Sequence, residues 1–242
     1  MNNFDDYHLM HNHSKIIDYP INKKLFPNAD KVKFIELTLN KNEYVLIPKN
    51  WFHWVYTEPK TVAISFELRR LEGNKNNILF EHIVKNKYFK NKGLLYDINY
   101  NNFIDSILNE EVSALFSSTN DLSPVYKNEY FKTFETNKLK NIILINNKFN
   151  YHTYLGALDL TSNPSWDSFK VLSHFIDFGN DIIINYMPTL WINLDKRVNS
   201  GLHYDGSDRV LYVVEGQKKI MLAPPNEKEN LYIKKMYRAG HR

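Results

Sequence analysis

The sequence predicts a mainly β fold with helical additions. Aromatic residues make up 14% of the chain, with 16 Tyr and 15 Phe, and such residues are enriched in strands. Residues 32–39 alternate apolar and polar side chains, and residues 182–184 form a run of Ile, both of which are typical of strands. With 242 residues, of which 43% are hydrophobic, the chain is long enough to bury one substantial core, or one core with a smaller satellite.

The charge balance and the absence of Cys narrow the classes of function. The formal net charge of +4 is carried by lysines scattered among Asn and acidic residues, which is not the pattern of a nucleic-acid surface. No segment reaches the roughly 18 consecutive apolar residues of a membrane span, and residues 1–20 lack the apolar centre of a signal peptide. Without Cys there are no disulfides and no thiolate ligands. We expect a soluble, intracellular protein, cytoplasmic or nuclear, in which His and carboxylate hold any metal.

The first block, residues 1–72, is rich in predicted strands. A turn at residues 40–43 and a break at Pro48 separate its apolar segments. Residues 69–77 are charged, Asn-rich and contain Gly, so we expect a linker or a long loop there. The expected strands, arranged as a β-meander, are residues 32–39, 44–47, 51–57 and 61–68.

The middle block, residues 73–150, changes in character and is interpreted as a helical linker or insert. Apolar residues recur at helical spacing over residues 99–117, which predicts an amphipathic helix, and a weaker helix is expected at residues 78–89. We interpret these apolar stripes as core packing. A strand is expected at residues 141–145.

The last block, residues 151–242, returns to strands. Ser165 is a typical N-cap and predicts a short helix to about Phe175. The turn at residues 215–217 predicts a hairpin between the last two strands, and a Pro-Pro pair ends the run. The expected strands are residues 181–186, 189–193, 209–214 and 218–222.

His203 and Asp205 are candidates for metal ligands. Residues i and i+2 of a strand project to the same face with their Cα atoms about 7 Å apart, so that an imidazole and a carboxylate converge on one ion. A His-x-Asp triplet alone is common, and a surface strand with a solvated Asp is the commoner explanation. His53 is the best candidate for a third ligand. The alternative for His53 is a hydrogen-bonded histidine among aromatic residues.

Two segments of the chain carry a resemblance to a known family. Residues 189–232 contain a Trp-Ile strand, Ser200 three residues before the His, the His-Tyr-Asp triplet and a Leu-x-Pro-Pro ending, and they resemble the metal-binding half of the cupin-like JmjC hydroxylases. Residues 31–68 resemble the other half, with an Ile-Pro-x-x-Trp-aromatic-His-x-Val strand followed by a Ser-containing strand. The resemblance implies a double-stranded β-helix of the cupin, or jelly-roll, type. It also makes His53 the distal metal ligand.

The same resemblance implies the cofactor and the cosubstrate. Two His and one carboxylate leave adjacent coordination positions open, an arrangement associated with non-haem Fe(II) oxygenases. The family implies Fe(II), with 2-oxoglutarate as cosubstrate. Lys218, fifteen residues after His203, would bind the far carboxylate of 2-oxoglutarate, and Ser200 would donate a hydrogen bond to it. An ordinary hairpin lysine is the alternative for Lys218, whose neighbour Lys219 should point toward solvent by strand alternation.

Arg209 departs from the family pattern, because similar hydroxylases often carry Asn or another small polar residue six positions after the first His. An inward-pointing Arg209 would bind an acidic substrate or cosubstrate, or block the pocket. His11 and His13 form a further His-x-His at a polar terminus. Solvated histidines are the commoner outcome in such a place.

The two halves occur in inverted order, since the family places the His-x-Asp half first. Three explanations are open. The chain is a circular permutant that closes one barrel, or its halves pair between copies in a homodimer or half-swapped assembly, or it is a slice of a fused cupin array. We favour the single-chain barrel, because either half alone would expose strand edges.

We therefore expect an Fe(II)- and 2-oxoglutarate-dependent dioxygenase, a hydroxylase acting on a protein or small-molecule substrate. A metal-binding cupin with other chemistry is one alternative, and a non-catalytic cupin that binds a ligand or partner is another. The direction in which Lys218 points discriminates between the 2-oxoglutarate-dependent dioxygenase and the cupin with other chemistry. If the lysine faces away from the metal, 2-oxoglutarate loses the residue that would bind its far carboxylate. Nothing in the sequence selects the substrate.

Overall fold

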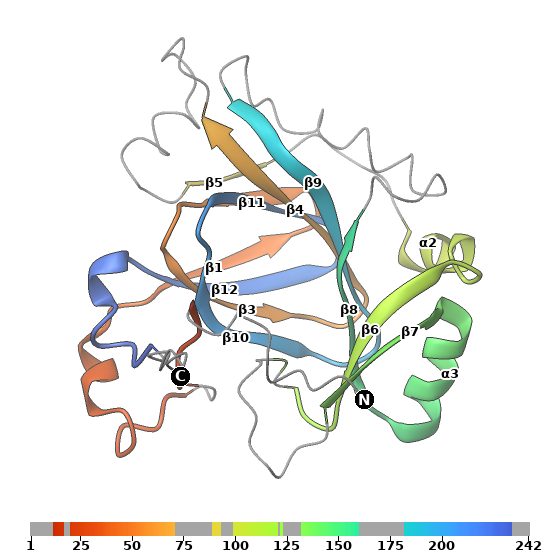
Figure 1. Ribbon diagram of the computed structural model, residues 1–242, viewed down its shortest axis with the longest axis horizontal. Coiled ribbons are helices and arrows are strands. Elements are labelled where there is room, and N and C mark those ends of the chain that lie inside the picture. The colour runs from red at the N-terminus through yellow and green to blue at the C-terminus, as the bar shows by residue number, and fades with distance from the viewer. Residues whose placement is uncertain are drawn as a thin grey trace, which may run out of the picture.

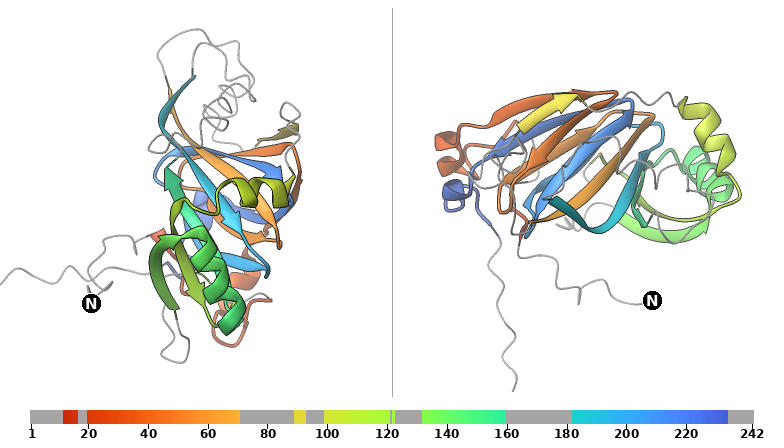
Figure 2. Two further views of the ribbon diagram at one scale, coloured as in Figure 1. Left: turned by 90° about the vertical axis from the view of Figure 1, so that its right-hand side faces the viewer. Right: turned by 90° about the horizontal axis from the view of Figure 1, so that it is seen from above.

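The computed structural model describes residues 12–16, 20–70, 89–92, 99–120, 122, 132–159 and 182–233 (Figure 1). Strands dominate this part of the chain, and the two α-helices lie at one end of it, beside β6 to β8 (Figures 1 and 2). Short 3-10 helices span Pro27–Lys31 and Pro225–Glu227. The other elements are β1 (Ile35–Asn40), β2 (Glu43–Ile47), β3 (Phe52–Thr57), β4 (Thr61–Arg70), β5 (Phe89–Lys92), α2 (Tyr100–Ser106), β6 (Glu111–Ser117), β7 (Lys132–Lys138), α3 (Leu139–Phe149), β8 (His152–Asp159), β9 (Ile182–Asn193), β10 (Val198–Tyr204), β11 (Asp208–Glu215) and β12 (Gln217–Ala223).

The strands form two antiparallel sheets. One has four strands in the order β1-β12-β3-β10, and the other has eight in the order β5-β2-β11-β4-β9-β8-β6-β7. The arrangement is a jelly-roll β-sandwich, which confirms the expected mainly β class with helical additions.

Strands from the first 70 residues alternate with strands from residues 182–223 throughout the four-stranded sheet and along β2-β11-β4-β9 of the eight-stranded sheet. β12 pairs with β1 and β3, and β11 pairs with β2 and β4. The predicted β-meander is therefore wrong, because successive strands from β1 to β4 lie in alternate sheets. The predicted hairpin is wrong for the same reason. Gly216, at φ +82°, turns the chain from β11 in one sheet to β12 in the other.

Two secondary-structure predictions in the middle block are wrong. The helix expected over residues 99–117 ends at Ser106, and residues 111–117 form β6, in which alternate side chains are buried. The strand expected at residues 141–145 lies inside helix α3, whose buried residues Leu139, Ile142 and Asn146 follow helical spacing. Short apolar runs satisfy either period, and packing decided between them. The helices expected at residues 78–89 and 165–175 lie outside the described residues, except for Phe89, where β5 begins.

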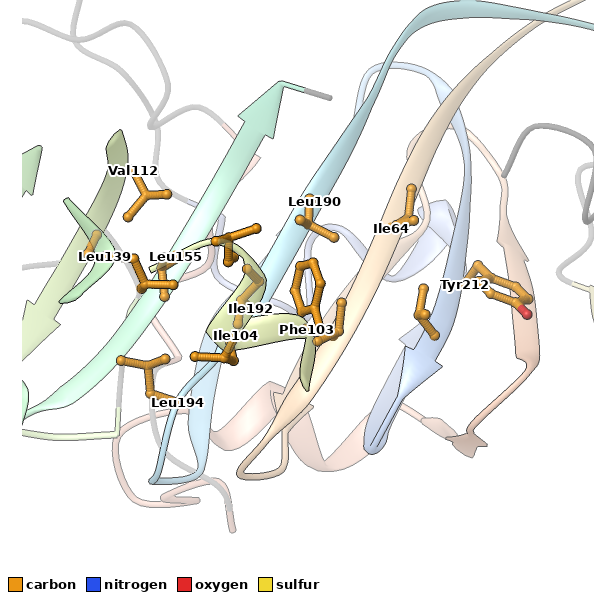
Figure 3. Packing of buried hydrophobic residues seen from close by; sticks show 14 of the residues in the cluster. Ile64, Phe103, Ile104, Val112, Leu139, Leu155, Leu190, Ile192, Leu194 and Tyr212 are labelled. Atoms are coloured by element: carbon orange, nitrogen blue, oxygen red, sulfur yellow. The ribbon is translucent and has the colours of Figure 1, made fainter. Parts of the chain in front are cut away.

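The eight-stranded sheet buries side chains on both faces where the two sheets overlap. Val45 and Leu211 face the interior between the sheets, whereas their neighbours Leu46 and Tyr212 face the outer side. On that outer side the sheet packs against α2 and α3, and Figure 3 shows Phe103 beside the strands that carry Ile64 and Leu190. Apolar burial on both faces therefore holds in place the strands whose side chains line the space between the two sheets, where the site described below lies.

Within the described residues, no helix combines the length and the hydropathy that a membrane crossing requires.

Candidate metal centre

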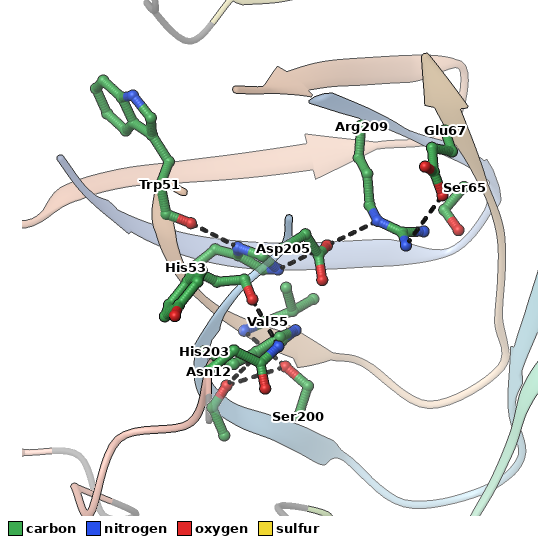
Figure 4. A network of polar contacts seen from close by, with 12 residues as sticks. Asn12, Trp51, His53, Val55, Ser65, Glu67, Ser200, His203, Asp205 and Arg209 are labelled. Carbon is green, nitrogen blue, oxygen red and sulfur yellow. Dashed lines mark hydrogen bonds and ion pairs between the residues drawn. The ribbon is translucent and has the colours of Figure 1, made fainter. Parts of the chain in front are cut away.

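Pairing of β3 with β10 brings two histidines together. His203 lies directly opposite His53 in the register of these strands, and their ring centroids are 4.1 Å apart. Asp205 follows the end of β10, and its Oδ2 lies 3.6 Å from His53 Nε2. One ligand atom from each of the three side chains lies within 4.8 Å of the others (Figure 4). The structure thus brings His53 to His203, from which 150 positions separate it in the sequence, and to the nearby Asp205, within one chain.

Hydrogen bonds select the nitrogen that each histidine presents. The Nδ1 of His53 is 3.1 Å from the carbonyl oxygen of Trp51, and the Nδ1 of His203 is 3.0 Å from that of Gly201. A carbonyl oxygen only accepts, so each Nδ1 carries the proton. In the neutral form of each imidazole the lone pair is then on Nε2, which is how a metal-binding imidazole is usually oriented.

A bulge in β10 shapes the backbone before His203. The register with β3 shifts between Asn199 and Leu202, and Gly201 within the shift has φ +73°. The Oδ1 of Asn199 accepts a hydrogen bond from the Gly201 amide at 2.7 Å and another from Trp54 Nε1. The bulge places the Gly201 carbonyl where His203 Nδ1 can reach it.

The charges of His203 and Asp205 suit a divalent cation. Burial, together with repulsion from His53, holds the pKa of His203 well below its usual range, so this imidazole is neutral near pH 7. Burial alone would raise the pKa of Asp205, but the neighbouring His53, His203 and Arg209 lower it overall. A neutral imidazole and an ionised carboxylate are the protonation states that metal binding requires.

The three side chains line a cavity between the two sheets. Its volume of about 330 Å³ lies at the lower end of the range of small-molecule sites. The cavity is mainly apolar, with polar groups at separate points on its wall. The apolar part of the wall comprises Ile47, Val55, Leu122, Trp191, Val198 and Leu211.

Lys218 is buried on the wall of the same cavity. Its side chain points inward from β12 and is 2% exposed, whereas the next residue, Lys219, is exposed. Nζ donates hydrogen bonds to Thr57 Oγ1 at 2.8 Å and to the Tyr154 hydroxyl at 3.0 Å. Among the described residues Lys218 makes no ion pair, and burial lowers its pKa to about 7. The wall of the cavity therefore carries a buried amine whose hydrogen-bond partners, in the part of the chain that the structure describes, are two neutral hydroxyl groups.

Ser200 also lines the cavity, but backbone groups engage its hydroxyl. Its Oγ accepts a hydrogen bond from the amide of Val55 at 3.2 Å and donates to the carbonyl of Gly201 at 3.3 Å. The second bond is long, so rotation of the hydroxyl toward a ligand would give up little.

Comparison with known proteins agrees with this geometry. Residues 97–242 match the model of the cupin-like domain. The chain belongs to the cupin-like domain family. That membership confirms the cupin part of the resemblance in the sequence, whereas the inverted order of the halves stays a prediction.

Two curated relatives of this cupin-like domain are JmjC domain-containing proteins. The chain is 27% identical over 237 residues to protein L887 of Acanthamoeba polyphaga mimivirus, a match that covers 86% of this chain and 37% of that protein. It is 37% identical over 60 residues to JmjC domain-containing protein C of Dictyostelium discoideum, covering 24% of this chain and 14% of that protein. The chain thus spans well under two thirds of either relative. No solved structure matches it.

Arg209 points inward in this cupin-like domain and contacts a candidate ligand. Its Nε is 2.9 Å from Asp205 Oδ2, and its Nη2 is 3.6 Å from Glu67 Oε2 (Figure 4). The Nε contact is ionic only, because the N–H is not aligned for a hydrogen bond. Arg209 therefore sits between two carboxylates at the cavity, with its side chain 32% exposed.

Several residues at this site carried no signal in the sequence. Thr57 and Tyr154 hold Lys218 from β3 and β8, and Glu67 faces Arg209 from β4. Each is ordinary in its own segment, and only sheet pairing brings it to the cavity. His13 differs from the expected solvated histidine, since its ring stacks on that of His203 with centroids 4.9 Å apart and an interplanar angle of 9°.

Proposed function

We propose that this cupin-like domain is an Fe(II)- and 2-oxoglutarate-dependent oxygenase, a hydroxylase that holds iron through His53, His203 and Asp205. The observation that carries the proposal is the cluster itself. Two imidazoles and one carboxylate meet at the wall of a cavity that the buried amine of Lys218 also lines. A two-His, one-carboxylate set with open positions is typical of non-haem Fe(II) oxygenases.

Lys218 supports 2-oxoglutarate as the cosubstrate. A buried ammonium group without an anionic partner is unfavourable, and the far carboxylate of a dicarboxylic acid would supply that partner. Thr57 and Tyr154 hold Nζ in place, so the lysine is oriented before the ligand arrives. In this proposal Ser200 turns its hydroxyl to the same carboxylate.

His53, His203 and Asp205 would hold the iron, and with 2-oxoglutarate bound it would supply the activation of dioxygen, in which 2-oxoglutarate would become succinate and carbon dioxide as the substrate is hydroxylated. The chain supplies position and shelter. The backbone carbonyls of Trp51 and Gly201 hold the two imidazoles, and the apolar wall around Val55 and Leu211 keeps water away from the reacting groups. The proposed substrate is a protein side chain or a small molecule.

Turnover of 2-oxoglutarate tests the proposal. Full-length protein with Fe(II) and ascorbate should form succinate and bind close to one equivalent of iron when prepared without oxygen. His203→Ala should lose both, because two ligands hold the ion far more weakly than three. Lys218→Met should keep the iron and lose succinate formation. Equal background succinate from the wild type and from His203→Ala would contradict the proposal.

A second candidate function is a non-catalytic metal-binding cupin, favoured by the contact of Arg209 with Asp205. A guanidinium group at that carboxylate weakens its attraction for a cation and narrows the cavity beside the site. The same measurements separate the two functions. Iron bound by the wild type and lost in His203→Ala, with no difference in succinate between them, would favour the non-catalytic protein.

A further inference from the structure

We propose that residues 12–16 form a strap that belongs to the metal centre, and that His13 is a positioning residue holding the imidazole of His203. The inference rests on the proposed metal site. It adds to that site a segment that lies outside residues 31–68 and 189–232, the two segments that resemble the cupin halves. The observations concern the backbone of the strap, its anchors and the stacked rings.

The strap pairs with the edge of β10 that β3 leaves free. His13 forms an antiparallel bridge with His203, and the amide of Ser14 donates to the carbonyl of Leu202 at 2.8 Å. On the other side of His203, Asn12 Nδ2 donates to the carbonyl of Tyr204 at 2.6 Å (Figure 4). The strap thus holds the backbone immediately before and after His203.

Two buried residues anchor the strap. Ser14 is 1% exposed, and its hydroxyl donates to the carbonyl of Leu231 at 2.5 Å. Ile16 is also 1% exposed and packs in the cluster that contains Trp54 and Leu202. Burial of an apolar side chain such as that of Ile16 stabilises the position of its segment. These anchors hold the strap against β10 independently of the His13 ring.

The His13 ring restricts the motion that the hydrogen bond of His203 leaves open. Nδ1 of His203 is bound to the Gly201 carbonyl, but a single bond allows the ring to rock about it. His13 lies nearly parallel to the ring, 4.9 Å away between centroids, which is an offset stack. Its own Nδ1 lies 2.9 Å from Asn12 Oδ1, and Asn12 is held by Tyr204, so the stacking ring is itself fixed.

Among the described residues, the cluster of candidate ligand atoms comprises His53, His203 and Asp205 without His13. A flat ring in contact with a ligand imidazole, but outside the ligand set, acts through orientation. The role predicted for position 13 is therefore one that another flat ring could fill, whereas a ligand would need its nitrogen.

Binding of Mn(II) and Co(II) to the full chain tests this role, measured by titration calorimetry and, for Co(II), by the visible absorption bands that respond to ligand geometry. His13→Leu keeps apolar bulk without a flat ring and should weaken binding about threefold to tenfold, the size expected for one aromatic stack. It should also shift the Co(II) bands. His13→Phe restores the stack and should bind within about twofold of the wild type.

His152→Leu serves as the matched control, because His152 is partly exposed on β8 and is not part of the cavity wall. It should leave metal affinity and the Co(II) bands unchanged. Wild-type affinity in His13→Leu, at an unchanged thermal unfolding midpoint, would overturn the inference. Equal losses in His13→Leu and His13→Phe would also overturn it, because they would require a nitrogen at position 13. If the wild type bound neither ion, the proposed function would fall as well.

Discussion

At the scale of single residues, burial of Lys218 lowers the stability of the fold, whereas the charge of the same side chain would bind the proposed ligand. Its pKa is lowered by burial from 10.5 to about 7. The folded chain therefore binds fewer protons at this residue than the unfolded chain between those two pH values. The free energy of unfolding rises with pH wherever the unfolded state binds more protons, so the cost of burying Lys218 is complete below about pH 7 and disappears as pH approaches 10.5.

Lys218→Met should therefore stabilise the protein near pH 7, by an amount on the order of a few kcal/mol. The advantage should shrink when unfolding by urea is measured at pH 9, because the wild-type lysine is then largely neutral. The same variant should no longer bind 2-oxoglutarate. Lys219→Met is the matched control on the same strand, since its side chain is exposed and it should change neither quantity.

Affinity of the wild type for 2-oxoglutarate should fall as pH rises above about 7, since the anionic ligand favours the protonated amine. Calorimetric titration in the presence of Mn(II) measures this slope. A pH-independent affinity between pH 6.5 and 8.5 would show that Lys218 does not pair with the ligand.

At the scale of elements, strand β10 contains a bulge that positions the backbone carbonyl to which the His203 imidazole is hydrogen-bonded. Gly201 has φ +73°, where a side chain is strained, and its carbonyl accepts from His203 Nδ1. Gly201→Ala should lower the free energy of unfolding by about 1 kcal/mol and weaken Mn(II) binding, because the carbonyl shifts. Gly206→Ala is the control, as a Cβ there meets nothing within 4 Å. Equal effects of the two substitutions would argue against a role for the bulge.

Elements could be predicted where a run rich in apolar and aromatic residues lies between turn residues. The strands β2, β3, β4 and β12 are such runs, and they lie close to their predicted ranges. Helix α3 was predicted in part as a strand, since the run of four apolar residues at 142–145 does not distinguish the two periods. Packing of one face of this segment against the sheet favours the helix over the strand, and the sequence does not show which face packs.

At the scale of the whole molecule, strands from the first 70 residues pair with strands from residues 182–223, so each of these two parts of the chain depends on the other for its fold. The β3–β10 pair, which carries His53 and His203, joins them at the site. We expect the site to close within one chain. Co-expressed His53→Ala and His203→Ala chains should then bind no more Mn(II) than either variant alone. A half-swapped assembly would instead regain sites in mixed dimers, in which one intact His53 meets one intact His203.

The amino-acid sequence by itself determined which segments form strands, that His203 and Asp205 project to the same face, and that Lys218 points inward. These features depend on a single strand, along which side chains alternate between the two faces. Tertiary structure alone decided which sheet each strand joins, that His53 lies opposite His203, and that Arg209 and His13 contact the candidate ligands. The physical reason is that alternation sets the face of a side chain but not its neighbour across the ladder. That neighbour depends on how both blocks bury their apolar faces together.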